Sequence, residues 1–177
     1  YKRVDWVIEA LGHLRHHEPL LRLRLDVVGD GPDRAALEAL AAARAPGQVQ
    51  FHGRVDEAAK QRLLQRADLL VLAADRSNEA FGIVQLEAMA FAVPALAFQR
   101  ARSGMHWVSA LSCLPWDGTP AELAPTIAWL AQRPELQAEA SREAAQRYRA
   151  LFGRPVWLKR VAACFAADQP GSLRSLE

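Results

Sequence analysis

The types and spacing of the residues from Glu79 to Glu87 could bind a phosphorylated ligand. A Phe-Gly pair, Phe81-Gly82, follows the first glutamate, and good helix formers lead into the second. Glycine lets the backbone approach a ligand closely, and the unpaired N–H groups of a first helical turn suit an anion such as a diphosphate. The two carboxylates could accept hydrogen bonds from hydroxyl groups on either side of that anion. A nucleotide-sugar, with its ribose, diphosphate and sugar, has this layout.

The element before this stretch supports the same interpretation. The apolar run Leu69–Leu72 indicates a buried strand, and the pattern after it predicts a helix beginning near Phe81 or Gly82. In an open parallel sheet, the loop after a strand lies at the carboxyl edge, where ligands bind. Glu87 would lie roughly 7–8 Å along the helix axis from Gly82, at about 1.5 Å per residue. Taken alone, however, an acid near a helix start is more often a capping or dipole partner.

Composition excludes several classes of function. The chain has 177 residues, of which 51% are hydrophobic and 24% charged, so it should form one domain with a proper core. The net charge of +2 and the lack of a basic run interleaved with aromatics argue against nucleic acid as a partner. Cys113 and Cys164 show no disulfide or metal-site pattern, which favours a reducing compartment. No apolar run is long enough to span a membrane.

Short strands alternate with helices along most of the chain, which predicts an α/β fold with a mostly parallel sheet. Residues 99–118 are the least regular part, although 111–114 could form a short strand, and residues 168–177 are expected to form a loose tail. Asp33 and Asp56 are expected to cap the helices that follow them. The predicted strands cover 21–28, 49–52, 68–73 and 93–98, and the predicted helices cover 4–14, 34–44, 56–66, 81–90, 119–132, 134–152 and 155–167.

The stretch also resembles a known family. Glu79 and Glu87 with seven residues between them, together with Phe81-Gly82, resemble the E-x7-E signature of the family 4 retaining glycosyltransferases, the "glycosyl transferases group 1" domain. The resemblance covers roughly residues 2–165. Further landmarks of that family occur in the expected order, at Lys2-Arg3-Val4-Asp5, Val27-Val28-Gly29-Asp30-Gly31-Pro32, Phe51-His52-Gly53-Arg54-Val55 and Ala67-Asp68-Leu69-Leu70-Val71-Leu72.

Two positions depart from the family pattern. Ala80 replaces the first glycine of the usual Glu-Gly-Phe-Gly, so less backbone freedom is expected there. Gly104-Met105-His106-Trp107 stands where a Gly-x-Pro-Glu is expected, and both the proline and the glutamate are absent. This second departure concerns the contacts with a donor sugar, and it leaves room for an unusual specificity or a weakened enzyme.

The resemblance implies a fold and a domain organisation. We expect a Rossmann-like three-layer parallel sheet with helices on both faces, the C-terminal half of a GT-B fold. Residues 1–167 would form the donor-binding domain, with 168–177 as its tail. The chain opens on Tyr1 rather than a methionine, and we expect the N-terminal acceptor domain of a longer protein to be absent from it.

The resemblance also implies an activity. The full enzyme would transfer a sugar from a UDP-, GDP- or ADP-sugar to a hydroxyl of a glycan, lipid-linked or small-molecule acceptor, with retention of anomeric configuration. No cofactor and no metal are expected, since the sequence lacks the Asp-x-Asp pair of the other large glycosyltransferase fold. A cytoplasmic location is expected, with possible attachment to the inner face of the membrane. The present chain alone should bind nucleotide weakly and transfer nothing.

Each candidate residue has a role by this resemblance. Glu79 and Lys2 would be catalytic, Glu79 by orienting the sugar and Lys2 by contacting the diphosphate. Glu87 would bind the ribose hydroxyls. The side chains near the helix start are expected to belong to the core, while their backbones face the ligand. The residues expected to contact the donor through the backbone are Phe81, Gly82, Ile83, Val84, Val55 and Gly29.

Two other functional classes stay open at this point. A non-catalytic nucleotide-sugar-binding or scaffold module could keep this fold without transfer activity, and the altered segment Gly104–Trp107 motivates that alternative. Another enzyme on the same fold, a sugar-nucleotide epimerase or a phosphorylase, is less favoured. No lysine is placed for the pyridoxal cofactor of a phosphorylase, and the landmarks of an epimerase differ.

Overall fold

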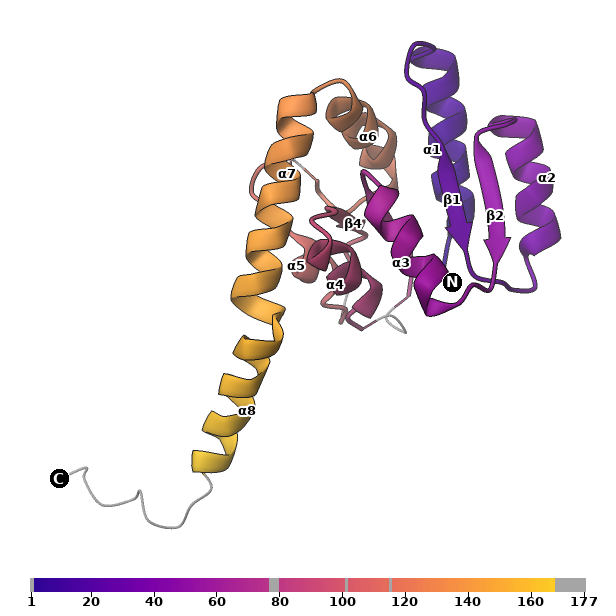
Figure 1. Ribbon diagram of the computed structural model, residues 1–177. Helices are drawn as coiled ribbons and strands as arrows, with labels where there is room; N and C mark the ends of the chain where they lie inside the picture. The colour runs from indigo at the N-terminus through magenta and orange to yellow at the C-terminus, as the bar shows by residue number, and fades with distance from the viewer. Residues whose placement is uncertain (1, 77–79, 101, 115, 168–177) are drawn as a thin grey trace.

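The computed structural model describes residues 2–76, 80–100, 102–114 and 116–167, and Glu79 therefore lies outside the described residues (Figure 1). Helices and strands alternate up to β4, after which the chain is helical. The elements in order are α1 (Val4–His17), β1 (Leu25–Val28), α2 (Arg34–Arg44), β2 (Val49–Gly53), α3 (Glu57–Arg66), β3 (Leu70–Leu72), α4 (Ile83–Ala90), β4 (Ala95–Ala97), α5 (Met105–Ser109), the 3-10 turn η1 (Pro120–Glu122), α6 (Leu123–Ala131), α7 (Pro134–Arg147), the π-helical turn η2 (Tyr148–Phe152) and α8 (Arg154–Ala167).

All four strands are paired in parallel, as the alternation of strands and helices predicted. β1 pairs with β2, beginning at Leu25 opposite Val49, and β3 pairs with β4, beginning at Leu70 opposite Ala95. Among the described residues these pairs form two separate two-stranded sheets.

The helices pack around the strands in a continuous series, in which α6 contacts both α1 and α7. α1 packs against α2 and α6, whereas α4 packs against α3, α5 and α7 and contacts both β3 and β4. Figure 1 shows α8 continuing from α7 and η2 and extending away from the strands. The fold is therefore α/β with helices flanking parallel strands, the class expected from the sequence.

Phe98 lies at the centre of the main core. Its side chain is fully buried, and its ring makes edge contacts with Trp6 and Trp116, with centroids 5.3 and 5.4 Å away. The apolar spacing that predicted α1 explains why that helix packs here, since Leu11 and Leu14 are buried in the same cluster. The core thus joins α1 to β4 and to the segment before α6.

Among the described strands, β1, β3 and β4 are shorter than predicted, whereas β2 extends one residue further, to Gly53. The predicted strand 21–28 begins only at Leu25, because its partner β2 begins at Val49 after the break at Pro46-Gly47 and offers no earlier residue for pairing. Residues 111–114 form a turn instead of the possible strand.

Helix boundaries and caps agree with the predictions in part. The Asp56 carboxylate accepts a hydrogen bond from the Ala59 N–H at 2.7 Å and caps α3, whereas Asp33 makes no side-chain cap to α2. The helix predicted over 134–152 changes to a π-helical turn at Tyr148. α5 was not predicted, because a five-residue helix is too short for its periodicity to be detected.

Replacement of Phe98 by alanine should destabilise the protein by about 3–5 kcal/mol, since it removes a buried aromatic ring from a packed cluster. Urea denaturation followed by circular dichroism would measure the free energy of unfolding. The matched control is Leu20→Ala, because the Leu20 side chain is 93% exposed and its loss should change stability by less than about 0.5 kcal/mol. Equal effects of the two substitutions would contradict the assigned core.

Candidate functional site

The carboxyl ends of the strands form one edge of the molecule, and most of the predicted site residues lie there. Gly29 directly follows β1, Val55 lies just beyond β2, and Asp75 comes soon after β3. α1 begins at the same edge, because Arg3 Nη1 lies 3.3 Å from Asp75 Oδ2. The connection from α1 to β1 then brings the end of β1 back to this edge. Ligands of open α/β sheets bind at such an edge.

A backbone hydrogen bond connects the residue after β1 to the last residue of β2 at this edge. The Gly29 N–H donates to the Gly53 carbonyl at 2.8 Å, and the two residues have φ angles of +123° and +67°, which favour glycine. Val55 is half-buried and lines a hollow between the end of β2 and α3. The structure therefore places Gly29 and Val55 at the exposed turns of neighbouring strands.

Gly82 determines where α4 begins. It is the N-cap residue with φ +71° and ψ +71°, and a Cβ there would lie 2.4 Å from Leu72 Cδ2 and 2.8 Å from Gln85 Nε2. The buried Gln85 side chain donates from Nε2 to the Phe81 carbonyl at 2.9 Å. The N–H groups of Ile83 and Val84 then open the first helical turn, in which the helix itself supplies no acceptor.

The segment Gly104–Trp107, whose sequence differs from the family pattern, contacts the chain just before α4. The Gly104 N–H donates to the Ala80 carbonyl at 2.8 Å, and Met105 is fully buried. His106 Nδ1 lies 3.2 Å from the Ala97 carbonyl oxygen. Trp107 is 56% exposed and makes an edge contact with the Phe152 ring. α5 therefore positions the loop before α4 without the expected proline and glutamate.

The side chains at the start of α4 differ from their prediction. Phe81, Ile83 and Val84 were all expected in the core, but Ile83 is 68% exposed and Phe81 37% exposed. Only Val84 packs against a buried cluster. The prediction is wrong for Phe81 and Ile83, because a first helical turn at the carboxyl edge lies beyond the strands that would cover it.

Glu87 lies on α4 and forms an ion pair that the sequence did not indicate. Its Oε2 is 2.9 Å from Lys60 Nζ, and its side chain is 33% exposed. Lys60 also lies 3.0 Å from Glu57 Oε2 on α3. No sequence signal pointed to Lys60, since it reaches Glu87 only through the packing of α3 against α4.

Lys2 is exposed and directly precedes Arg3, the N-cap residue of α1. Arg3 has φ +40° and ψ +44°, an uncommon conformation for a residue with a side chain. Its guanidinium donates to Asp5 and Asp75 and lies 4.0 Å from the Trp6 ring centroid. These contacts stabilise the strained backbone beside Lys2. Hydrogen bonds from Arg3 lower the pKa of Asp5 below its ordinary value.

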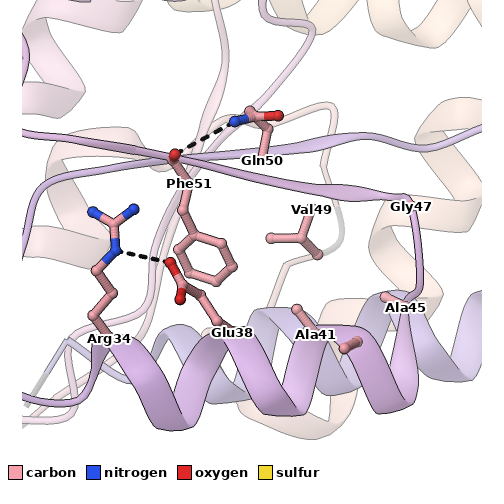
Figure 2. Close-up of a pocket in the computed structure, with 9 residues that line it drawn as sticks. Arg34, Glu38, Ala41, Ala45, Gly47, Val49, Gln50 and Phe51 are labelled. Carbon is pink, nitrogen blue, oxygen red and sulfur yellow. Dashed lines mark hydrogen bonds and ion pairs between the residues drawn. The ribbon is translucent and has the colours of Figure 1, made fainter.

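A second hollow lies between α2 and β2 (Figure 2), and Arg34, whose Nη1 lies 3.8 Å from Asp30 Oδ1 in the turn after β1, lines one end of it. Phe51 and Val49 face Ala41 and Ala45 across it, and Arg34 pairs with Glu38 at 2.8 Å beside it. It contains none of the predicted site residues and lies along β2. The carboxyl edge is therefore the candidate site.

A family model described as "glycosyl transferases group 1" matches residues 1–147 of the chain. The chain belongs to this family. The order of landmarks along the sequence and the placement of α4 after β3 agree with that membership.

Among characterised proteins, D-rhamnosyltransferase WbpZ of Pseudomonas aeruginosa is 35% identical over 130 residues, which cover 71% of this chain and 34% of that protein. The chain thus spans about a third of the length of this relative.

Solved glycosyltransferase structures show the same fold. S. aureus TarM, in a complex with fondaparinux, alpha-GlcNAc-glycerol and UDP, matches with a TM-score of 0.75 and 18% identity over 93% of this chain and 33% of its own. WaaG, a glycosyltransferase involved in lipopolysaccharide biosynthesis, matches with a TM-score of 0.70 and 26% identity over 95% of this chain and 44% of its own. These neighbours confirm the α/β, Rossmann-like fold expected for the C-terminal half of a GT-B protein.

The roles of individual residues stay predictions. The structure brings Gly29, Val55 and the start of α4 to the carboxyl edge, with Glu87 further along α4, while Glu79 lies outside the described residues.

No helix in the described part of the chain combines the length and apolar character needed to cross a bilayer.

A left-handed backbone alone costs a residue with a side chain about 1–2 kcal/mol. Replacement of Gly82 by alanine should destabilise the protein by more than this. The extra cost arises because the new Cβ would overlap the packed Leu72 and Gln85 side chains. Gly47→Ala is the matched control, since Gly47 has φ +76° with open space around its Cβ position. Thermal and urea unfolding of both variants would measure the difference, and equal losses would contradict the proposed close packing.

Asp5 should make stability depend on pH at the acid end. The pKa of Asp5 is lowered in the folded state from the ordinary 3.8. The ionised Asp5 therefore stabilises the folded protein fully above pH 3.8, and this stabilisation is lost as the pH falls through the folded pKa. Asp5→Asn should therefore be less stable than the unmodified chain at neutral pH, and the difference should shrink below about pH 4. Urea unfolding between pH 3 and 7 would measure it. A pH-independent loss in Asp5→Asn would contradict the assignment.

Proposed function

We propose that this chain is the donor-binding domain of a retaining glycosyltransferase that uses a nucleoside-diphosphate sugar. The observation that carries the proposal is the geometry of α4, which begins at a glycine cap on the carboxyl edge and bears a partly exposed carboxylate, Glu87, further along the helix. A helix start of this kind suits a diphosphate, and a carboxylate beyond it suits vicinal hydroxyls.

The donor would lie along the carboxyl edge. The Glu87 carboxylate would accept hydrogen bonds from the ribose hydroxyls, and the backbone N–H groups from Phe81 to Val84 would donate to the phosphates or the sugar. The exposure of Phe81 and Ile83 fits a helix start that faces a ligand. Val55 and Gly29, at the ends of β2 and β1, would border the base and the nucleotide.

Two further residues would act on the reacting end of the donor. Lys2, beside the strained Arg3, would neutralise the charge that develops on the departing diphosphate. Glu79 would hold the sugar hydroxyls and orient the anomeric carbon. The acceptor hydroxyl would attack from the face that the diphosphate leaves, so that the anomeric configuration is retained. No metal is required, because the helix start and the cation carry the leaving-group charge.

The neighbours support a nucleotide as ligand. S. aureus TarM is described in complex with UDP, and the pneumococcal O-GlcNAc transferase GtfA in complex with UDP and GlcNAc. For the present chain the donor would be a UDP-, GDP- or ADP-sugar, and the base is to be identified by titration. The acceptor would be a glycan, a lipid-linked intermediate or a small molecule, bound through an N-terminal domain of the longer protein. A cytoplasmic location belongs to this proposal.

The proposal predicts that the chain binds one nucleoside diphosphate weakly and that Glu87→Ala reduces the affinity about tenfold or more, the range of lost hydrogen bonds to a charged group. Calorimetric titration with UDP, GDP, ADP and their sugar conjugates would measure it. Glu135→Ala is the matched control, because Glu135 is exposed in the first turn of α7, and Gln137 of the same turn donates to the Asp68 carbonyl before β3, at the end opposite the carboxyl edge. Absence of binding at millimolar ligand, or equal binding by both variants, would contradict the proposed site.

One observation favours a second function, that of a non-catalytic nucleotide-sugar-binding module. Where the family pattern has a glutamate, this chain has Trp107, whose exposed ring packs against Phe152, so that carboxylate is lost from the sugar end of the site. Nucleotide binding by the longer protein without transfer or hydrolysis across a panel of donors would support this alternative. Turnover of any one donor by the longer protein would exclude it.

A further inference from the structure

Lys60 connects two elements of the proposed donor site. It lies on α3, which begins just after Val55, and its ammonium group reaches Glu87 on α4. The Lys60 Nζ–Glu87 Oε2 distance is 2.9 Å, and the Lys60 side chain is only 26% exposed. The hydrogen bond with Glu87, and to a smaller extent the one with Glu57, raises the pKa of Lys60 above its ordinary value. The lysine therefore stays charged.

The two carboxylate partners of Lys60 differ in their position and in their exposure. Glu57 lies three residues earlier on the same helix and is 67% exposed, and such surface pairs contribute little. Glu87 lies on another helix, is half as exposed, and can meet Lys60 only while α3 and α4 keep their packing. The pair with Glu87 therefore restricts the orientation of that carboxylate.

This pairing uses one oxygen of the Glu87 carboxylate. Lys60 contacts Oε2, and within the described part of the chain the structure assigns no partner to Oε1. A carboxylate oriented in this way can accept a hydrogen bond from a ligand hydroxyl at its second oxygen without releasing the first. Preorganisation of this kind lowers the conformational cost of binding.

We propose that Lys60 is a positioning residue for the donor nucleotide, orienting Glu87 through Oε2 so that Oε1 faces a ribose hydroxyl. The inference rests on the proposed function, in which Glu87 binds the ribose. By this proposal, α3 contributes to recognition of the ribose of the nucleotide through Lys60. The opposite arrangement, in which Lys60 competes with the ribose for Glu87, predicts tighter binding when the lysine is removed.

Calorimetric titration of the 177-residue chain with a nucleoside diphosphate and with its 2′,3′-dideoxy analogue would test the proposal. The probe is whichever of UDP, GDP and ADP binds the unmodified chain most tightly. The ratio of the two dissociation constants reports the ribose hydroxyls alone, and a purely structural defect would weaken both ligands equally. We expect the unmodified chain to prefer the ribose form about tenfold, the range of a hydrogen bond to a charged group.

Lys60→Met should reduce that preference at least threefold, whereas Lys60→Arg should restore most of it because a cation again reaches Glu87. Glu57→Gln is the matched control, since it removes the other partner of Lys60 and should leave the preference unchanged. Thermal unfolding of each variant would verify that all three are folded. An unchanged ratio in Lys60→Met, or tighter binding by that variant, would overturn the role of Lys60.

The two proposals can fail separately. If the unmodified chain binds no nucleoside diphosphate, or binds both forms equally, the ribose role of Glu87 is wrong, and the role of Lys60 is wrong with it. If the unmodified chain prefers the ribose form and Lys60→Met keeps that preference, the proposed function stands and only the role of Lys60 is overturned.

Discussion

The close packing of Gly82 against Leu72 and Gln85 is the constraint on which the candidate site depends. With no side chain, Gly82 can adopt a left-handed backbone directly above the end of β3, and the buried Gln85 amide then binds the Phe81 carbonyl. α4 therefore begins directly after the carboxyl end of β3. That starting point sets which N–H groups face outward and where Glu87 lies on the helix.

The rest of the edge is organised by charged contacts between elements that are distant in sequence. Arg3 joins the start of α1 to Asp75 after β3, and Lys60 joins α3 to Glu87 on α4. Each pair brings a half-buried cation to a carboxylate at the carboxyl ends of the strands. Arg3 also pairs with Asp5, and Lys60 also pairs with Glu57. The two contacts between distant elements therefore act mainly by limiting the orientations of the side chains at this edge.

The departure at Gly104–Trp107 changes the chemistry of the site more than its shape. The Gly104 N–H still supports the loop at Ala80, and the buried Met105 packs α5 against β4. These contacts hold the end of the loop before α4, although an expected carboxylate is replaced by an exposed tryptophan. Shape and chemistry can separate in this way because backbone hydrogen bonds position the loop, whereas side chains select the ligand.

The sequence by itself determined the α/β class, most helices, the parallel pairing and the family, because periodicity, caps and ordered landmarks are local signals that survive without tertiary contacts. Through the family resemblance it also named Gly29, Val55 and the start of α4 as donor contacts, and the structure places all three after the carboxyl ends of strands. Only the tertiary structure decided that Ile83 is exposed, that β1 begins at Leu25, and that α5 exists. It alone placed Lys60 on Glu87 and Arg3 on Asp75. These features depend on which surfaces meet when helices pack, and residues far apart in the chain carry no local signal of that meeting.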